Sequence, residues 1–511
     1  MQLNKPNAST LTICCETYKN IFYATLSLCN LSIMFENLSA RLQKKEISPV
    51  ELLQEYLTRI KSKDSQLNCF IEVEEKEAMA QAKKSEERIV KGASLSKWDG
   101  IPIGIKDNIV TRGRKTTCAS KILQGFESPY SATVIQKLEN AGMVTLGRLN
   151  MDEFAMGSST ENSSVKTTRN PYDLDRAPGG SSGGSASAVS ADFIPAALGS
   201  DTGGSIRQPA AFCGIVGHKP TYGTISRFGL IAFASSLDQI GPMTQSVHDS
   251  EILYHLMAGH DANDSTSVSL APMEKFSTYN SQKIEKIKIG VPADLIDACD
   301  TDVKKSFEES LKIIQSQIPG TELIDISLPH QKYGIPVYYL TATSEASTNL
   351  SRFDGIRYGY RFEDAKNLAD VYEMSRTLGF GPEVKRRILL GTYALSSGYY
   401  DAFYGQAQKV RSLIRQDYLQ AWDKVDIIMM PSAPSVAFKL GEKTKDPVSM
   451  YLSDVLTVGA SLAGVPALSV PMPFDELPVG LQIQGPYFSE PMLFALGKVL
   501  ESQLNNKKPN I

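Results

Sequence analysis

The chain has 511 residues and a nearly balanced charge, with 53 lysines and arginines against 56 aspartates and glutamates and a formal net charge of −3. Its hydrophobic content of 42 % and charged content of 21 % are typical of globular proteins with a large buried core. This composition excludes an overall electrostatic attraction to nucleic acid or to a membrane surface, so any contact with RNA is expected to be local or to be made through a partner.

The first 33 residues are expected to form an extension, either disordered or a targeting peptide. Residues 20–35 are fairly apolar, but asparagine, serine and threonine interrupt them, so they are too short and too polar for a membrane-spanning helix. They also lack the pattern of a secretory signal. We therefore expect one folded domain over residues 34–508, located in the cytoplasm, or in an organelle matrix if residues 1–33 are a targeting peptide.

Three segments of the N-terminal part carry clear secondary-structure signals. Ser48 is the predicted N-cap of a helix over residues 48–60, because a proline follows it and Glu51 completes a capping box. The apolar run at residues 101–110 predicts a strand. Residues 134–150 predict a helix that ends at a glycine and is followed by a strand.

The C-terminal part alternates between strand and helix signals. Strands are predicted at residues 286–291 and 322–327, with an amphipathic helix between them over residues 303–314. A buried strand is predicted at residues 425–431, and two strands about a tight turn are predicted within residues 464–486. Strand and helix alternate along the whole chain, which indicates an α/β fold with a mostly parallel or mixed sheet.

Cysteine and histidine usage points away from disulfides and from a bound metal. The seven cysteines are odd in number and show no paired metal-ligand spacing, which fits a reducing compartment. His255 and His260 are five residues apart, so they would not stack on one helix face. We therefore expect no metal site in this chain.

A glycine- and serine-rich stretch, "PGGSSGGSASAVSAD" at residues 178–192, allows three interpretations. A flexible linker is disfavoured because small, apolar residues typical of a core follow it directly. A phosphate-binding loop is disfavoured because the required lysine is missing and no basic residue lies between Arg176 and Arg207. The third interpretation is an active-site loop.

A second stretch, "GSDTGGSIRQP" at residues 199–209, supports the active-site interpretation. Ser205 follows two glycines, so its hydroxyl is expected beside free backbone N–H groups, as an acyl-transfer nucleophile requires. No histidine lies in either loop, but Lys106 ends an apolar strand and could act as a neutral base if it were buried. Spacing alone favours the alternative that Lys106 is a surface residue with a half-buried stem.

Three motifs resemble the amidase signature family: "GIPIGIKD" at 100–107, "PGGSSGGSASA" at 178–188 and "GSDTGGSIRQPAAFCGIVGHKPTYG" at 199–223. The resemblance covers about residues 34–490, nearly the whole chain. It implies the fold of that family, which is one large mixed β-sheet layered with helices.

The resemblance also implies a catalytic triad of two serines and a lysine. Ser205 would be the nucleophile, and Ser181, preceded by a cis peptide bond, would connect it to Lys106. Ser182 would be a supporting hydroxyl. The oxyanion hole would be formed by backbone N–H groups of Ser205 itself and of its three neighbours Thr202, Gly203 and Gly204.

Five further segments resemble one branch of the family, the A subunits of the aspartyl/glutamyl-tRNA amidotransferases. They lie at residues 147–163, 226–244, 344–359, 383–404 and 446–471. This resemblance implies that the chain hydrolyses glutamine and passes ammonia to a partner within a heterotrimer that it forms with the B and C subunits. The B subunit would amidate Glu-tRNA(Gln), and in some organisms Asp-tRNA(Asn), with ATP and Mg²⁺. No cofactor is expected in this chain.

In that branch a tyrosine, an arginine and an aspartate hold the substrate glutamine, and the matching residues here are Tyr338, Arg387 and Asp454. Arginine suits the α-carboxylate and aspartate suits the α-ammonium group. The neighbouring Arg386 is an alternative to Arg387, while Asp454 could be a surface carboxylate and Tyr338 a core residue. The alternative functions are a free-standing amidase for another small amide and a catalytically silent scaffold.

Overall fold

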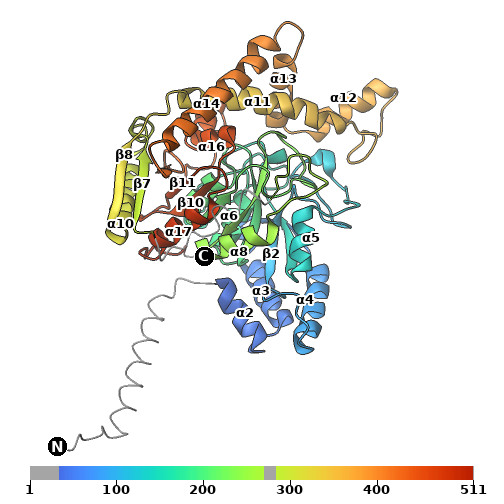
Figure 1. Cartoon of the computed structure of the whole chain (residues 1–511). Coiled ribbons are helices and arrows are strands. Elements are labelled where there is room, and N and C mark those ends of the chain that lie inside the picture. The colour runs from blue at the N-terminus through green and yellow to red at the C-terminus, as the bar shows by residue number, and fades with distance from the viewer. Residues whose placement is uncertain (1–33, 270–283, 510) are drawn as a thin grey trace, which may run out of the picture.

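The computed structural model describes residues 34–269, 284–509 and 511 (Figure 1). The predicted extension at residues 1–33 lies outside the described residues, so the domain boundary near residue 34 stays a prediction. No helix within the described part of the chain is both long enough and apolar enough to cross a membrane.

The described residues form a single mixed sheet of eleven strands, which confirms the predicted fold class. The strands lie in the order β1-β3-β2-β4-β6-β5-β10-β11-β9-β7-β8. Strand β2 pairs in parallel with β3 and β4, whereas β10 pairs in antiparallel fashion with β5 and β11. The bounds are β1 Phe70–Val73, β2 Pro102–Lys106, β3 Val144–Leu149, β4 Ala196–Asp201, β5 Val216–Lys219, β6 Gln239–Thr244, β7 Lys286–Val291, β8 Gly320–Asp325, β9 Ile427–Pro431, β10 Ala467–Pro471 and β11 Gly480–Gln484.

Helices surround this sheet. In Figure 1, helices α2 to α4 lie at one end of the molecule, and α11 to α14 lie at the opposite end. The principal helices are α2 Met34–Gln43, α3 Pro49–Leu67, α4 Glu75–Val90, α5 Thr133–Asn140, α6 Gly183–Ser190, α7 Arg207–Phe212, α8 Val247–Met257, α10 Thr301–Gln317, α11 Gly334–Asn349, α12 Leu368–Gly379, α13 Pro382–Ala394, α14 Gln406–Trp422, α16 Val458–Ala463 and α17 Glu490–Glu501. The small helix α6 and strand β4 separate the two glycine-rich loops.

Most predicted elements are confirmed, and two need correction. The strand predicted over residues 101–110 already ends at Lys106, because the chain turns there. Strands β10 and β11 do pair, but residues 472–479 join them, so the predicted tight turn is wrong. One further hydrogen bond, from the Met472 N–H to the Val479 carbonyl oxygen at 2.9 Å, lies beyond the Pro471–Gly480 pair. Prolines at positions 473 and 478 have no N–H to donate, so they do not extend the ladder into the connection.

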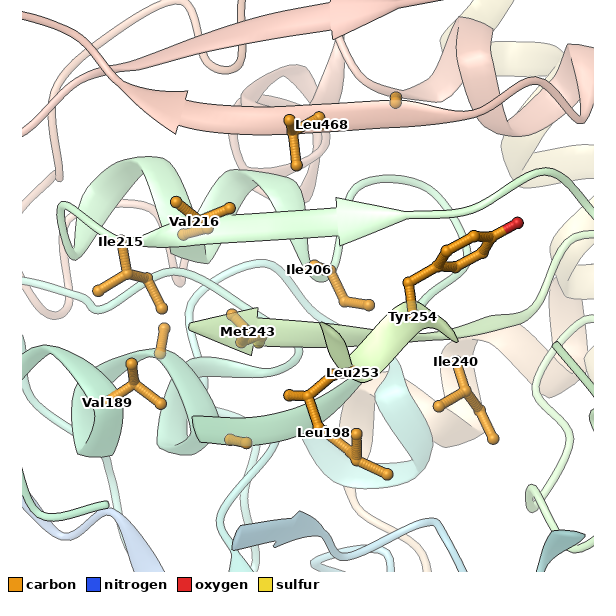
Figure 2. Close-up of a cluster of buried hydrophobic side chains, with 14 of the residues drawn as sticks. Val189, Leu198, Ile206, Ile215, Val216, Ile240, Met243, Leu253, Tyr254 and Leu468 are labelled. Atoms are coloured by element: carbon orange, nitrogen blue, oxygen red, sulfur yellow. The ribbon is translucent and has the colours of Figure 1, made fainter. Parts of the chain in front are cut away.

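Ile206 anchors the second glycine-rich loop to the sheet. Its side chain is fully buried in the cluster shown in Figure 2. Strands β4, β5 and β6 each present a glycine to it. A Cβ atom added to Gly199 would lie 2.9 Å from a side-chain carbon of Ile206, and one added to Gly217 or to Gly241 would lie 3.0 Å from such a carbon. The three glycines therefore form a shallow pit that holds the residue directly after Ser205.

The predicted capping box at the start of α3 is present and can be tested. The Glu51 N–H donates to the Ser48 hydroxyl at 3.1 Å, and the Ser48 N–H donates to the Glu51 carboxylate at 2.9 Å. Ser48→Ala should cost about 1 kcal/mol. Hydrogen exchange at the first turn of α3 should then become about fivefold faster. Ser48→Thr, which keeps the hydroxyl, is the control, and equal exchange in all three proteins would contradict the capping role.

Candidate active site

Lys106 lies at the carboxyl end of β2 and is completely buried, so its interpretation as a surface residue is wrong. Its Nζ atom lies 2.8 Å from the Ser181 hydroxyl, 2.8 Å from the Ser182 hydroxyl and 2.9 Å from the Ser200 hydroxyl. Sequence reasoning missed Ser200, which lies near the end of the neighbouring parallel strand β4. The pairing of β2 with β4 brings both residues to the same edge of the sheet.

The hydrogen bonds define which hydroxyl can give a proton to Lys106. The Ser182 hydroxyl donates to the carbonyl oxygen of Ser200 at 3.2 Å, so it accepts from the amine. Within the described residues, the Ser181 hydroxyl has no partner besides Lys106. A neutral Lys106 can therefore accept the proton of Ser181, while Ser182 and Ser200 hold the amine in place.

Burial favours this neutral form of Lys106. Removal of the amine from water lowers its pKa to about 7, although Asp152, Asp201 and Asp238 act in the opposite direction through their negative charge. The hydrogen-bond partners of the amine are all uncharged oxygen atoms. The side chain can thus serve as a base near neutral pH.

Ser205 lies in the turn between β4 and α7, with 7 % of its surface exposed, while Ser181 is completely buried. The peptide bond between Gly180 and Ser181 is cis, as the sequence resemblance implies. The Ser182 N–H donates to the Ser205 carbonyl oxygen at 3.2 Å, which joins the two loops. The Ser181 and Ser205 hydroxyls do not form the expected hydrogen bond with each other in this structure.

The turn before Ser205 offers free backbone donors. Within the described part of the chain, the N–H groups of four successive residues have no acceptor: Thr202, Gly203, Gly204 and Ser205. A Cβ atom at Gly203 would lie 2.6 Å from the ring of Tyr338, and one at Gly204 would lie 2.2 Å from the Thr457 hydroxyl. Glycine is therefore required at both positions, and the free N–H groups can stabilise an oxyanion.

A buried ion pair fixes the shape of this turn. Asp201 and Arg207, both completely buried, form two hydrogen bonds of 2.9 Å. Asp201 also accepts from the N–H of Ile206 at 3.2 Å. On the other side of the turn, the Thr202 hydroxyl donates to Asp238 at 2.7 Å. Since each buried charge has a partner, the loop is held in one geometry before any ligand binds.

The structure places Arg387, on α13, among aromatic rings and an acidic partner. Its Nε donates to the Glu383 carboxylate at 2.8 Å, whereas its two terminal nitrogens have no acceptor among the described residues. Arg387 is only 2 % exposed, while nearly half of the Arg386 side chain is exposed. Arg387 is therefore the better candidate for binding an anion in the interior.

Asp454 lies at the end of the short helix η8 (Leu452–Asp454) and is 7 % exposed, so it is not a surface carboxylate. One oxygen accepts from the Ser158 hydroxyl at 2.6 Å, and the other is buried without a partner among the described residues. Burial raises the pKa of Asp454 to about 7, against the opposing effects of Ser158 and Arg387. A buried acceptor without a partner is costly, so this oxygen is suited to binding a cationic or N–H group of a ligand.

The candidate ligand-binding residues are connected to the oxyanion turn. The Tyr338 ring lies against Gly203, and burial raises the pKa of its hydroxyl, which stays protonated at neutral pH. Thr457, three residues after Asp454, donates to the Gly203 carbonyl oxygen at 2.7 Å and accepts from Arg207 through its own carbonyl oxygen at 2.8 Å. In the part of the chain that the structure describes, no three His, Cys, Asp or Glu side chains gather closely enough to hold a metal ion.

Comparison with known proteins identifies relatives that cover most of the chain. The chain is 53 % identical over 469 residues to the A subunit of a glutamyl-tRNA(Gln) amidotransferase from Geobacillus kaustophilus, covering 91 % of this chain and 96 % of the relative. It is 52 % identical over 480 residues to the protein of the same name from Listeria monocytogenes, covering 93 % and 98 %.

Solved structures show the same architecture. The glutamyl-tRNA(Gln) amidotransferase A subunit of Thermotoga maritima superposes with a TM-score of 0.73 at 42 % identity, covering 89 % of this chain and 92 % of that chain. A peptide amidase in complex with chymostatin has a TM-score of 0.78 at 28 % identity, covering 92 % and 98 %. The family model described as amidase matches residues 51–494. The chain therefore belongs to the amidase family.

Proposed function

We propose that this chain is the glutamine-hydrolysing subunit of a tRNA-dependent amidotransferase. The name that its relatives share at 52–53 % identity supports this proposal. The observation that carries it is a set of polar atoms without partners in the described part of the chain. They are the two terminal nitrogens of Arg387 and one carboxylate oxygen of Asp454, whose neighbour Thr457 contacts the oxyanion turn. A free-standing amidase for a simple amide would have no use for such a set of atoms.

In the proposed mechanism, Ser205 attacks the carboxamide carbon of glutamine. Its proton passes through the Ser181 hydroxyl to neutral Lys106, and the developing negative charge on oxygen is stabilised by the N–H groups of the turn. The protonated Lys106 then returns a proton, through Ser181, to the leaving nitrogen, and ammonia departs. Water, activated by the same relay, hydrolyses the acyl-enzyme and releases glutamate.

The substrate glutamine would be oriented by its α-substituents. Arg387 would bind the α-carboxylate through its two terminal nitrogens, and Asp454 would accept from the α-ammonium group. Tyr338 would donate its hydroxyl within the same pocket. Fixing both groups places the carboxamide at a defined distance from Ser205, which selects glutamine over the shorter asparagine more strongly than an apolar pocket could.

The ammonia would be used by partner proteins rather than by this chain. We propose a heterotrimer with the B and C subunits of the amidotransferase, in which the B subunit binds Glu-tRNA(Gln) and converts it to Gln-tRNA(Gln) with ATP and Mg²⁺. Glutamine hydrolysis itself needs only the residues described above. The proposed location is the cytoplasm, or an organelle matrix if residues 1–33 are a targeting peptide.

Removal of the proposed nucleophile tests whether this chain produces the ammonia that a partner subunit uses. Ser205→Ala should abolish glutamine hydrolysis, because the Ser205 hydroxyl is the one expected to attack beside the free N–H groups of the turn. The assembled enzyme should still amidate Glu-tRNA(Gln) when ammonium chloride is added, since the ammonia would then not need to be produced. Release of glutamate and formation of Gln-tRNA(Gln) are measured separately, and glutamine hydrolysis by the variant would contradict the role of Ser205.

The pH dependence should differ between two substrates. Lys106, with a pKa lowered to about 7, is protonated and inactive below that pH. Asp454, with a pKa raised to about 7, loses the charge that binds the α-ammonium group as the pH falls through the same range. For a short aliphatic amide, the logarithm of kcat/KM should therefore fall by about one per pH unit below pH 7, and for glutamine by about two. Equal slopes for both substrates would contradict the role of Asp454.

Loss of the guanidinium should affect substrates selectively. Arg387→Ala should lower kcat/KM for glutamine. The loss corresponds to about 2–5 kcal/mol of transition-state stabilisation, which is the cost of breaking a buried charged contact. A short amide without an α-carboxylate should lose much less, because it never uses this contact. Arg386→Ala is the matched control and should leave both substrates nearly unchanged. An equal loss for both amides would mean that Arg387 supports the fold rather than the substrate.

A further inference from the structure

Glu383 is a buried acidic residue that the proposed mechanism does not use. It lies one helical turn before Arg387 on α13, with 11 % of its side chain exposed. One carboxylate oxygen accepts from the Arg387 Nε at 2.8 Å and from the Tyr451 hydroxyl at 3.0 Å, and the other pairs with the exposed Arg386. Both carboxylate oxygens therefore already have partners within this chain.

Three aromatic rings lie close to the guanidinium of Arg387. The Arg387 guanidinium carbon lies 5.0 Å from the Tyr339 ring centre, 5.5 Å from that of Tyr451 and 5.6 Å from that of Phe233. Tyr339 and Tyr451 stack on each other with ring centres 3.8 Å apart. Such contacts favour the cation over any neutral side chain, but they do not decide how the guanidinium is rotated within its plane.

Glu383 supplies the missing constraint. A guanidinium has one Nε edge and one edge with two terminal nitrogens, and a carboxylate can bind either edge. Because Glu383 occupies Nε, the terminal nitrogens remain free for a second carboxylate. Burial alone would raise the pKa of Glu383, but Arg387 and Arg386 hold that pKa below its ordinary value, so the group is ionised at neutral pH.

We propose that Glu383, supported by Tyr451, is a positioning residue that sets the specificity for amides with an α-carboxylate by fixing the orientation of Arg387. This inference rests on the proposed function. It adds a role for the Glu383 carboxylate, which would contact Arg387 but not the substrate. Glu383 acts through Arg387 alone, so its contribution should vanish when Arg387 is absent or when the substrate lacks an α-carboxylate.

The test uses Glu383→Gln, which keeps the size of the side chain and an acceptor oxygen but removes the charge. The full chain is assayed together with the proteins that co-purify with it, on glutamine and on a short aliphatic amide. We expect KM for glutamine to rise about tenfold with kcat changed less than about threefold, and kcat/KM for the short amide to stay within about twofold. Tyr451→Phe, which removes only the hydroxyl, should change KM in the same direction by a smaller factor.

A double variant separates positioning from general support of the fold. Glu383→Gln combined with Arg387→Ala should be no worse on glutamine than Arg387→Ala alone, because the two residues act as one unit. Glu373→Gln, an exposed glutamate on the preceding helix α12, is the matched control and should leave both substrates unchanged. If Glu383→Gln fails to fold, Tyr451→Phe carries the same comparison.

The outcomes distinguish this inference from the proposed function. If the unmodified chain does not hydrolyse glutamine, the proposed function is wrong, and the inference falls with it. If the unmodified chain hydrolyses glutamine but Glu383→Gln leaves KM unchanged, only the inference is overturned. Equal losses for both substrates, or a double variant whose loss is the product of the single losses, would likewise overturn it and show a structural role for Glu383.

Discussion

The proposed chemistry depends on a lysine amine that is removed from water and surrounded by neutral oxygen atoms. Three serine hydroxyls satisfy the hydrogen bonds of Lys106 without stabilising its positive charge as strongly as a carboxylate in direct contact would. The nearby aspartates act only at a distance and partly offset the cost of burial. A carboxylate moved into direct contact would form a salt bridge and remove the base, so the serine-rich composition of the first loop is a requirement for reactivity.

The position of that amine is useful only because the nucleophile turn is equally fixed. The pit of three strand glycines holds Ile206, and the ion pair between Asp201 and Arg207 closes the turn from behind. Both sets of contacts hold the backbone N–H groups of residues 202–205 in place without accepting hydrogen bonds from them. The proposed oxyanion hole therefore needs no rearrangement when charge develops on the substrate.

Much of this arrangement could be predicted from the sequence, but not all of it. Features that depend on neighbouring residues could be recognised directly in the sequence. They are the capping box at Ser48, the alternation of strands and helices, and the two glycine-rich loops. The contact of Lys106 with Ser200 could not be predicted, because it depends on which strand lies beside β2. The burial of Lys106 was missed for the same reason, since a single strand does not show what covers its end. Glu383 carried only an ordinary i, i+4 spacing to Arg387, which on most helices marks a solvent-exposed pair.

The reacting groups and the candidate substrate-binding groups come from separate stretches of the chain. The proposed base, relay hydroxyls and nucleophile lie within residues 106–205, whereas the side chains at Tyr338, Arg387 and Asp454 lie within residues 338–454. Hydrogen bonds such as that of the Ser158 hydroxyl with Asp454 join the two stretches. Because none of the proposed reacting side chains lies in the later stretch, substitutions at Tyr338, Arg387 or Asp454 offer evolution a route to a new amide substrate that leaves the base, the relay and the nucleophile unaltered.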